Sequence, residues 1–354
     1  MPLFSIIIPT FNPDRHDFHK CLRSIAEQEF TDYEVVVVDD GSDDPCAIQE
    51  VVSESECKSK VMILRLDNGG PYAARRRGID VSVGRYVVSV DDDDELIGTD
   101  ALQLIASALE QAAFPDYLLI NATRDKKSPV GCIDYSSLDG DALSSGVRSI
   151  ETKEFNRLFI CNNDYNSACC KVIRRAMFPS ASETLPRVVM ADDRCLCLDF
   201  LPNAQTAGLL DIPLYFYRPT GASITRSAYK AELFYQVNLV EERVRSWVIS
   251  DGYNEREWAR GFLLLTSNHL NAISRNAEYT HARLAEIFKT VVNTDSVKRA
   301  LVYLDDVELK PAEYRQLALL KTNKFNQLII FMIPHAIKSK VIRFLSSVKK
   351  AIVR

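Results

Sequence analysis

The sequence predicts an α/β fold: a doubly wound, Rossmann-like and mostly parallel sheet with helices on both faces. Up to about residue 125, short runs of apolar, mostly β-branched residues alternate with segments whose apolar residues recur every three or four positions. The apolar runs contain no polar alternation, which is typical of parallel strands buried on both sides. Polar segments rich in Asp and Gly follow the runs, as loops after such strands do.

The elements can be placed in chain order. Strands are expected at Phe4–Pro9, Glu34–Val38, Val61–Leu66, Tyr86–Val90 and Tyr117–Ile120, with helices between them near 18–25, 48–52, 72–79 and 102–109. Residues 126–150 are poor in large apolar residues and rich in Ser, Gly and Asp, so we expect an irregular insertion there. Residues 151–225 are mixed, and the pattern from about 228 to 320 is helical.

This pattern predicts three parts: an α/β domain over residues 1–225, a helical region over 226–320 and a tail over 321–354. A chain of 354 residues is long enough for such an organisation. The start of the chain lacks the features of a signal peptide, and no apolar run approaches the ~20 residues of a membrane-spanning helix. The nine cysteines lack zinc or redox spacing, which favours reduced thiols and a cytoplasmic location.

Four polar motifs directly follow predicted strands. They are Pro9-Thr10-Phe11-Asn12, Asp39-Asp40-Gly41-Ser42, Asp67-Asn68-Gly69-Gly70 and Asp91-Asp92-Asp93-Asp94. In an open α/β sheet, ligands bind in the crevice beyond the carboxyl ends of the strands. We therefore expect the four motifs to line one ligand site.

The acidic motif at residues 91–94 has the most specific chemistry. Four consecutive carboxylates repel one another, so such groups shift their pKa values or recruit a cation. Ligation by oxygen alone suits Mg²⁺ or Mn²⁺, with substrate phosphates completing the coordination shell. The alternative is a solvated acidic turn, which the position directly after an apolar strand disfavours.

The second and third motifs suit a nucleotide. A carboxylate at Asp39 or Asp40 can accept a hydrogen bond from a base or a ribose hydroxyl, although a simple tight turn is the alternative. Gly69 allows a ligand to approach the backbone closely. Three arginines follow at residues 75–77; we expect Arg75 or a neighbour to face a diphosphate and two of the three to lie on a solvated helix face.

Several classes of function are disfavoured because their motifs are missing. The sequence contains no G-x-G-x-x-G, no G-x-x-x-x-G-K-[ST] and no G-x-S-x-G. A dinucleotide-dependent enzyme, a P-loop nucleotidase and an α/β-hydrolase are therefore poor hypotheses. The five histidines show no spacing typical of metal ligands.

The runs SIIIPTFN, VVVVDDGSDD and NGGPYAARRRGIDVSVGRYVVSVDDDDEL occur in this order over residues 3–97 and resemble the family 2 glycosyltransferases of the GT-A fold. Weaker similarity continues through 166–175, 190–196 and 215–225. The resemblance implies inverting transfer of a hexosyl or N-acetylhexosaminyl group from a nucleotide sugar, with UDP as the expected carrier. The implied acceptor is a hydroxyl of a glycan or lipid-linked molecule in surface polysaccharide synthesis.

The resemblance also implies roles for individual residues. Asp39 is expected to contact the base, Asp91 the ribose, and Asp93, in a DXD-type motif, the Mn²⁺ or Mg²⁺ ion. The remaining expected donor-binding residues are Pro9, Thr10, Phe11, Asn12, Asp40, Asn68, Gly69, Arg75 and Asp92. Asp192-Asp193 stands where the family usually has Glu-Asp, so Asp193 is the expected general base, with Asp192 as the alternative. Arg76 is a departure, because an Asn is common at that position.

The end of the chain is basic. Nine Lys and Arg residues and no Asp or Glu follow Glu313. After Pro334, apolar residues recur at helical spacing between the cations, a pattern typical of helices on anionic membranes. We expect residues 324–354 to contact the inner face of a membrane; docking on the acidic body is the alternative. A nucleic-acid partner is not expected, because this amphipathic segment has no interleaved aromatic residue beyond Phe344.

Two other functions remain as alternatives. The first is a catalytically silent protein of the same fold that binds sugar nucleotides or acts as a scaffold; the acidic motif and Asp192-Asp193 argue against it. The second is a nucleotidyltransferase that makes the sugar nucleotide. Its Gly-rich, Arg-containing loop after the first strand is replaced here by Pro9-Thr10-Phe11-Asn12.

Overall fold

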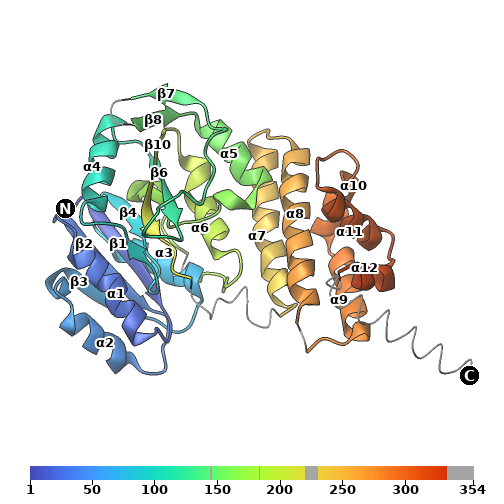
Figure 1. The fold of residues 1–354 in the computed structure, drawn as a ribbon, viewed down its shortest axis with the longest axis horizontal. Helices are drawn as coiled ribbons and strands as arrows, with labels where there is room; N and C mark the ends of the chain where they lie inside the picture. The colour runs from blue at the N-terminus through green and yellow to red at the C-terminus, as the bar shows by residue number, and fades with distance from the viewer. Residues whose placement is uncertain (144–145, 183, 220–229, 277, 333–354) are drawn as a thin grey trace, which may run out of the picture. The chain divides into compact units, whose positions relative to one another are not determined.

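A computed structural model describes residues 1–143, 146–182, 184–219, 230–276 and 278–332. The chain divides into two compact units, Met1–Gly221 and Ala222–Arg354 (Figure 1). The predicted boundary between residues 225 and 226 falls outside the described residues. So does the predicted amphipathic helix after Pro334.

The first unit is built on a ten-stranded sheet with the order β3-β2-β1-β4-β9-β6-β10-β8-β7, and β5 pairs with β10. Its strands are β1 (Phe4–Thr10), β2 (Tyr33–Asp39), β3 (Val61–Arg65), β4 (Tyr86–Ser89), β5 (Glu95–Leu96), β6 (Tyr117–Thr123), β7 (Gly140–Ala142), β8 (Val147–Ile150), β9 (Lys171–Arg174) and β10 (Ala207–Phe216). Strands β1 to β4 are parallel, as are β6 and β10, and β9 runs antiparallel between β4 and β6. All five predicted strands are present.

The central strands are buried along their whole length, as their apolar runs predicted. Every residue of β1, β4 and β6 is buried. The polar Ser5 on β1 is accommodated because its hydroxyl donates to Glu34 Oε1 at 2.6 Å and accepts from Gly84 N at 2.8 Å. Strand β3 is partly exposed because it forms one edge of the sheet.

Helices cover both faces of the sheet. They are α1 (Arg15–Ala26), α2 (Pro45–Glu54), α3 (Pro71–Val81), α4 (Ala101–Gln111), α5 (Thr152–Cys161) and α6 (Asp192–Phe200). The connections β1-α1-β2 and β2-α2-β3 both move across the sheet toward the β3 edge, whereas β3-α3-β4 crosses back to the other side of β1. Because such crossovers are right-handed, α3 lies on the face opposite α1 and α2. Helices α1 and α2 pack together, and α3 packs on β1, β2 and α6.

Two features bring α3 close to the sheet. The helix begins after Gly70, whose φ of 85° suits glycine, and Pro71 occupies its first turn. At Gly78 a Cβ atom would lie 2.7 Å from Ile7 Cγ2 and 2.8 Å from Val38 Cγ2. The absence of a side chain there therefore lets the helix lie directly on β1 and β2.

The prediction of an irregular insertion at residues 126–150 is wrong for two segments. Strand β8 pairs antiparallel with β10, and β7 pairs with β8 at the edge of the sheet. Val147 and Ile150 are buried there. The sequence did not predict these strands, because strands of three and four residues show too little periodicity and depend on pairing with distant residues.

The described part of the second unit consists of helices joined by short connections. Its helices are α7 (Leu233–Ser250), α8 (Glu255–Ser274), α9 (His281–Asn293), α10 (Asp295–Val302), α11 (Pro311–Lys321) and α12 (Phe325–Met332). A short turn joins α7 and α8, which pack side by side (Figure 1). Their core contains Val237, Val240 and Val244 from α7 with Trp258 and Phe262 from α8. None of the helices in the described ranges combines the length and apolar character that a bilayer crossing requires.

Candidate functional site

The carboxyl ends of β1, β2 and β4 bring three predicted motifs together. Thr10 ends β1 opposite Asp39, the last residue of β2. The Thr10 hydroxyl donates a hydrogen bond to Asp92, which follows β4. The Thr10 carbonyl accepts one from the amide of Asp40 at 2.9 Å. The predicted convergence of these strand-end residues is therefore present in the tertiary structure.

Asp40 joins the third motif to the second. Its buried carboxylate accepts hydrogen bonds from the amides of Gly69 and Gly70, each at 2.8 Å. Burial raises the pKa of Asp40, and the two N–H groups oppose that shift. A Cβ atom at Gly41, whose φ is 84°, would lie 2.9 Å from the backbone nitrogen of Asn68. Asp40 and Gly41 together hold the 68–70 loop against the end of β2.

The loops after β1 and β2 are tied to each other. The amide of Asn12 donates to Ser42 Oγ at 2.8 Å. The Asn12 side chain donates from Nδ2 to Asp43 Oδ2 at 3.0 Å and accepts from the backbone amide of Asp43 at Oδ1 at 2.8 Å. Asp39 accepts from Ser42 N at 2.8 Å and pairs with Arg65. Phe11, which precedes Asn12, has half of its surface exposed, so its ring is accessible to a ligand.

The four carboxylates at residues 91–94 have different surroundings. Asp91 pairs with Arg75 at 2.6 Å, and Asp92 accepts from Thr10. Asp94 is buried and accepts from the Tyr215 hydroxyl at 2.7 Å and from Arg218 N at 2.8 Å. Burial raises the pKa of Asp92 to about 7 and that of Asp94 to about 8, and neighbouring carboxylates add to both shifts. The segment is therefore not a solvated acidic turn.

Arg75 connects the acidic motif to a distant part of the chain. Its buried guanidinium donates from Nε to Ser89 Oγ at 3.2 Å, from Nη2 to Asp91 Oδ1 at 2.6 Å, and from Nη1 to Asp192, which is 117 residues away in the sequence. Burial acts to lower the pKa of Arg75, but the carboxylates of Asp91, Asp192 and Asp193 raise it well above its usual value. Arg75 is therefore charged, and its three nitrogens all have protein partners.

Asp192 and Asp193 form the first turn of α6, where the helix dipole stabilises negative charge. The turn follows Ala191, whose φ of 64° is left-handed. Burial raises the pKa of Asp193 to about 7; the charge of Asp192 adds to this shift and Arg75 opposes it. Within the described part of the chain, Asp193 Oδ1 is buried and accepts no hydrogen bond. It therefore keeps a lone pair that can take a proton.

The expectation that two of the three arginines lie on a solvated face is wrong for Arg76. Its side chain is 1% exposed, lies 3.2 Å from Asp199 Oδ2 and donates to the carbonyl of Pro179 at 2.6 Å. The helix face that carries Arg76 packs on α6 rather than facing water. Arg77 is partly exposed and donates to Ser182 O at 3.1 Å.

Sequence reasoning did not identify three residues that contact the site. Arg187 donates to Asn68 Oδ1 at 3.0 Å. Tyr215 and Arg218 hold the acidic motif, and Arg218 Nε donates to the carbonyl of Asp93 at 2.7 Å. The segment 215–225 had been included in the resemblance, but an isolated Tyr or Arg has no spacing that reveals its partner. Their roles depend on contacts over more than 100 residues of sequence.

The acidic motif fits a divalent cation held jointly with a substrate. Among the residues that the structure describes, no three His, Cys, Asp or Glu side chains form a complete metal site. Mg²⁺ and related ions commonly use one or two carboxylates together with substrate phosphates. Asp93 is partly exposed, whereas the carboxylates on either side of it contact Thr10 and Tyr215. The donor set therefore suits a cation completed by a diphosphate.

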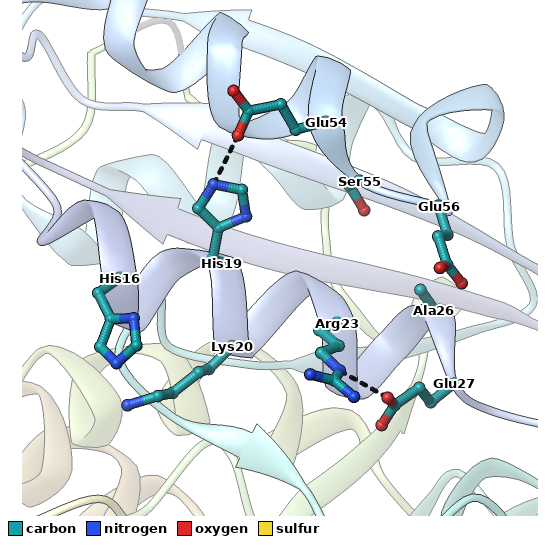
Figure 2. Close-up of a pocket in the computed structure, with 9 residues that line it drawn as sticks. All are labelled: His16, His19, Lys20, Arg23, Ala26, Glu27, Glu54, Ser55 and Glu56. Atoms are coloured by element: carbon teal, nitrogen blue, oxygen red, sulfur yellow. Dashed lines mark hydrogen bonds and ion pairs between the residues drawn. The ribbon is translucent and has the colours of Figure 1, made fainter.

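A separate pocket of about 420 Å³ lies on the exposed side of α1 near the end of α2 (Figure 2). Its polar side chains contact one another: His19 lies 2.8 Å from Glu54, and Arg23 lies 2.6 Å from Glu27. None of the predicted site residues lines this pocket. We therefore place the candidate site at the strand ends.

Comparison with known proteins identifies the family. The model of the family described as "Glycosyl transferase family 2" matches residues 5–180. The chain belongs to glycosyltransferase family 2. The matched residues include all four strand-end motifs but end before Asp192 and Asp193. The match therefore places the acidic motif, but not the two aspartates of α6, within the family domain.

Relatives in this family align over part of their length. "Uncharacterized glycosyltransferase YibD" of Escherichia coli is 38% identical over 106 residues, 30% of each chain. "GalNAc(5)-diNAcBac-PP-undecaprenol beta-1,3-glucosyltransferase" of Campylobacter jejuni is 33% identical over 111 residues, 31% of this chain and 36% of that one. "Poly(ribitol-phosphate) beta-N-acetylglucosaminyltransferase TarS" of Staphylococcus aureus is 27% identical over 242 residues, 67% of this chain and 39% of TarS. The aligned parts thus span between 30% and 39% of these relatives.

A solved structure shows the same fold. The crystal structure of S. aureus TarS 1–349 in complex with UDP-GlcNAc matches with a TM-score of 0.64 and 19% sequence identity. The match covers 93% of this chain and 90% of that chain. It confirms the predicted GT-A-type fold class of the family.

Proposed function

We propose that this family 2 glycosyltransferase moves a hexosyl or N-acetylhexosaminyl group, with inversion, from a UDP-linked donor to a hydroxyl of a glycan or lipid-linked acceptor in surface polysaccharide synthesis. The names of two relatives support this class of reaction. One is named as a glucosyltransferase of an undecaprenol-linked glycan and the other as an N-acetylglucosaminyltransferase of poly(ribitol phosphate). The TarS structure in complex with UDP-GlcNAc supports the choice of UDP.

One observation carries the proposal: a single guanidinium spans the strand-end carboxylate and the α6 aspartates. Arg75 Nη2 lies 2.6 Å from Asp91 Oδ1, and Nη1 lies 3.7 Å from Asp193 Oδ1. A donor whose ribose contacts Asp91 would therefore lie beside Asp193, the expected base. Transfer requires this proximity, because the acceptor hydroxyl must reach the anomeric carbon and the base together.

The residues present can carry out a single displacement. The Asp193 carboxylate takes the proton of the acceptor hydroxyl, whose oxygen forms a bond to the anomeric carbon. The bond from that carbon to the diphosphate oxygen breaks, the configuration inverts and the nucleoside diphosphate leaves. One positioned base is sufficient, because no carboxylate nucleophile is needed. A Mn²⁺ or Mg²⁺ ion held at Asp93 would supply positive charge to the leaving diphosphate.

Thermal unfolding against a panel of nucleotide sugars, with and without Mn²⁺, tests the proposed donor. A ligand present at ~100 times its dissociation constant should add ~2.7 kcal/mol to the stability of the native state. We expect a Mn²⁺-dependent rise with UDP-sugars and none with other nucleotides. No rise with any donor, from a folded sample, would contradict the proposal.

The silent-scaffold alternative requires a second measurement. Such a protein would bind the nucleotide sugar and show the same thermal shift. It would not transfer the sugar to an acceptor. It would also lack the slow transfer of the sugar to water, that is, hydrolysis of the donor, which an enzyme can catalyse when no acceptor is present. Release of UDP from the stabilising donor therefore separates an enzyme from a scaffold.

We also propose that the basic end of the chain, within residues 324–354, attaches the protein peripherally to an anionic membrane surface. The first part of this range, α12, packs on α9 and α11, so the residues after it would make the contact. The proposal rests on the basic composition after Glu313 and on the spacing of apolar residues in this segment. Co-sedimentation of the full-length protein with anionic liposomes at low salt tests it. Lys338, Lys340 and Arg343 changed together to Gln should weaken the binding, and binding equal to that of the unchanged protein would contradict the proposal.

A further inference from the structure

Asp192 and Asp193 are adjacent and chemically identical, so the sequence does not decide which of them acts as the base. Their surroundings differ in the folded protein. Arg75 Nη1 donates a hydrogen bond to Asp192 Oδ2, whereas its distance to Asp193 Oδ1 is 3.7 Å, too long for a hydrogen bond. Asp193 Oδ1 is buried and accepts no hydrogen bond from the described residues.

This difference has a chemical consequence. A carboxylate oxygen held in a charged hydrogen bond to a guanidinium is a poor proton acceptor, since protonation would break that bond. An oxygen that accepts no hydrogen bond has no such bond to lose when it takes a proton. Burial raises the pKa of Asp192, and the ion pair with Arg75 opposes that shift. The hydrogen bond from Arg75 thus disfavours proton transfer to Asp192 and leaves Asp193 as the group that receives the proton.

We propose that Arg75 is a positioning residue that assigns different roles to the two aspartates by binding Asp192 and leaving Asp193 for the acceptor hydroxyl. The inference rests on the proposed glycosyl transfer and extends it to a residue that does not touch the acceptor. Arg75 suits this role because its buried side chain is held by Ser89 and Asp91 as well as by Asp192. A lysine ammonium is a single nitrogen on a flexible stem, so it lacks the planar fork by which three separate guanidinium nitrogens reach these three partners.

Other charged groups near Asp193 do not replace Arg75. Lys171 is buried, and its ammonium donates to the carbonyl oxygens of Tyr165 at 2.7 Å and Ser167 at 2.6 Å. Asp91 faces the two aspartates with the same sign of charge and is paired with Arg75. Arg75 is therefore the cation that distinguishes Asp192 from Asp193.

The substitution Asp192→Asn tests the proposal. Without its charged partner, the guanidinium should move the short distance to Asp193 and hold it as it now holds Asp192. We expect kcat to fall about tenfold or more and the pH of half-maximal transfer to fall by about one unit, with donor KM within about threefold of wild type. Asp192→Glu should restore both values. Arg77→Lys, on the same helix and outside the site, should leave them unchanged.

A measurement that needs no activity separates this inference from the proposed function. The carboxyl ¹³C signal of Asp193 can be titrated by NMR in metal-free wild-type and Asp192→Asn protein, and its pKa should be lower in the variant. If wild type transfers no sugar, the proposed function fails while this titration still tests Arg75. An unchanged Asp193 titration would overturn the inference. The inference would also be overturned if Asp192→Asn abolished transfer while Asp193→Asn retained it.

Discussion

The Tyr215 hydroxyl donates a hydrogen bond to Asp94 Oδ2 at 2.7 Å, although 121 residues separate the two in the sequence. The oxygen of the same hydroxyl accepts one from the amide of Asp91 at 3.1 Å. Tyr215 and Asp94 are both buried. Strand β10 therefore holds the acidic motif at both its first and its last residue, and leaves Asp92 and Asp93 between these contacts.

Removal of this hydroxyl should destabilise the first unit. For Tyr215→Phe we expect the free energy of unfolding to fall by about 1–3 kcal/mol, because buried polar groups lose their partner. Both tryptophans lie in the second unit, so calorimetry or near-UV circular dichroism is the suitable probe. Tyr235→Phe, at a side chain that is 67% exposed, is the control. Equal stability of the two variants would count against a structural role for the hydroxyl.

Asp93→Ala should remove the metal-dependent part of donor affinity. The side chain is partly exposed, so stability should change by no more than about 0.5 kcal/mol. Calorimetric titration of UDP with and without Mn²⁺ measures the effect. Asp139→Ala, at an exposed loop position, should retain the metal dependence of wild type. If Asp93→Ala retains it as well, Asp93 is not the metal ligand.

Asp193→Asn should slow transfer by about 10²–10⁴-fold, the usual contribution of a general base. The amide cannot accept the proton of the acceptor hydroxyl, but the donor contacts at the strand ends remain. The dissociation constant of the donor should therefore stay within about threefold of wild type. Single-turnover transfer and donor titration on the same sample give both quantities. Full transfer activity would exclude Asp193 as the base.

The transfer rate should rise with pH. Asp193 must be deprotonated to act as a base, and burial raises its pKa to about 7. Below that pH the rate should fall by about tenfold per unit, so at pH 5 it should be about a hundredfold below its plateau. The rate is measured at saturating donor at each pH, because Asp92 and Asp94 in the acidic motif also titrate in this range. A rate that does not change between pH 5 and pH 8 would contradict this prediction.

His269 should make the second unit sensitive to acid. Burial lowers its pKa from 6.5 to about 4. Between these values the unfolded chain binds a proton that the folded unit does not, so stability is full above pH 6.5 and falls by about 3 kcal/mol as the pH approaches 4. Denaturant unfolding followed by the fluorescence of Trp247 and Trp258 reports on this unit. His269→Phe should flatten the acid loss, and His281→Gln, at an exposed histidine, should not.

The main strands could be predicted because a buried parallel strand needs a continuous apolar run, and such runs are visible locally. The runs at Phe4–Pro9 and Tyr86–Val90 became β1 and β4 with small shifts at their ends. Strands β7 and β8 could not be predicted in this way. They are short, and their pairing with β10 and with each other supplies the stability that their own residues lack. The prediction of a solvated Arg76 was wrong for a similar reason. Arg76 is buried because α3 packs on α6, a contact between distant parts of the chain.

By itself, the sequence determined the α/β class and the placement of Thr10, Asp39 and Asp91 at the ends of parallel strands. These features follow from local patterns of apolar and polar residues and from the geometry of the sheet. Only the tertiary structure decided that Arg75 binds Asp91 and Asp192, and that Asp193 keeps an oxygen to which none of the described residues donates a hydrogen bond. Contacts across 117 residues depend on how α3 and α6 pack together, and packing leaves no periodic signal in the chain.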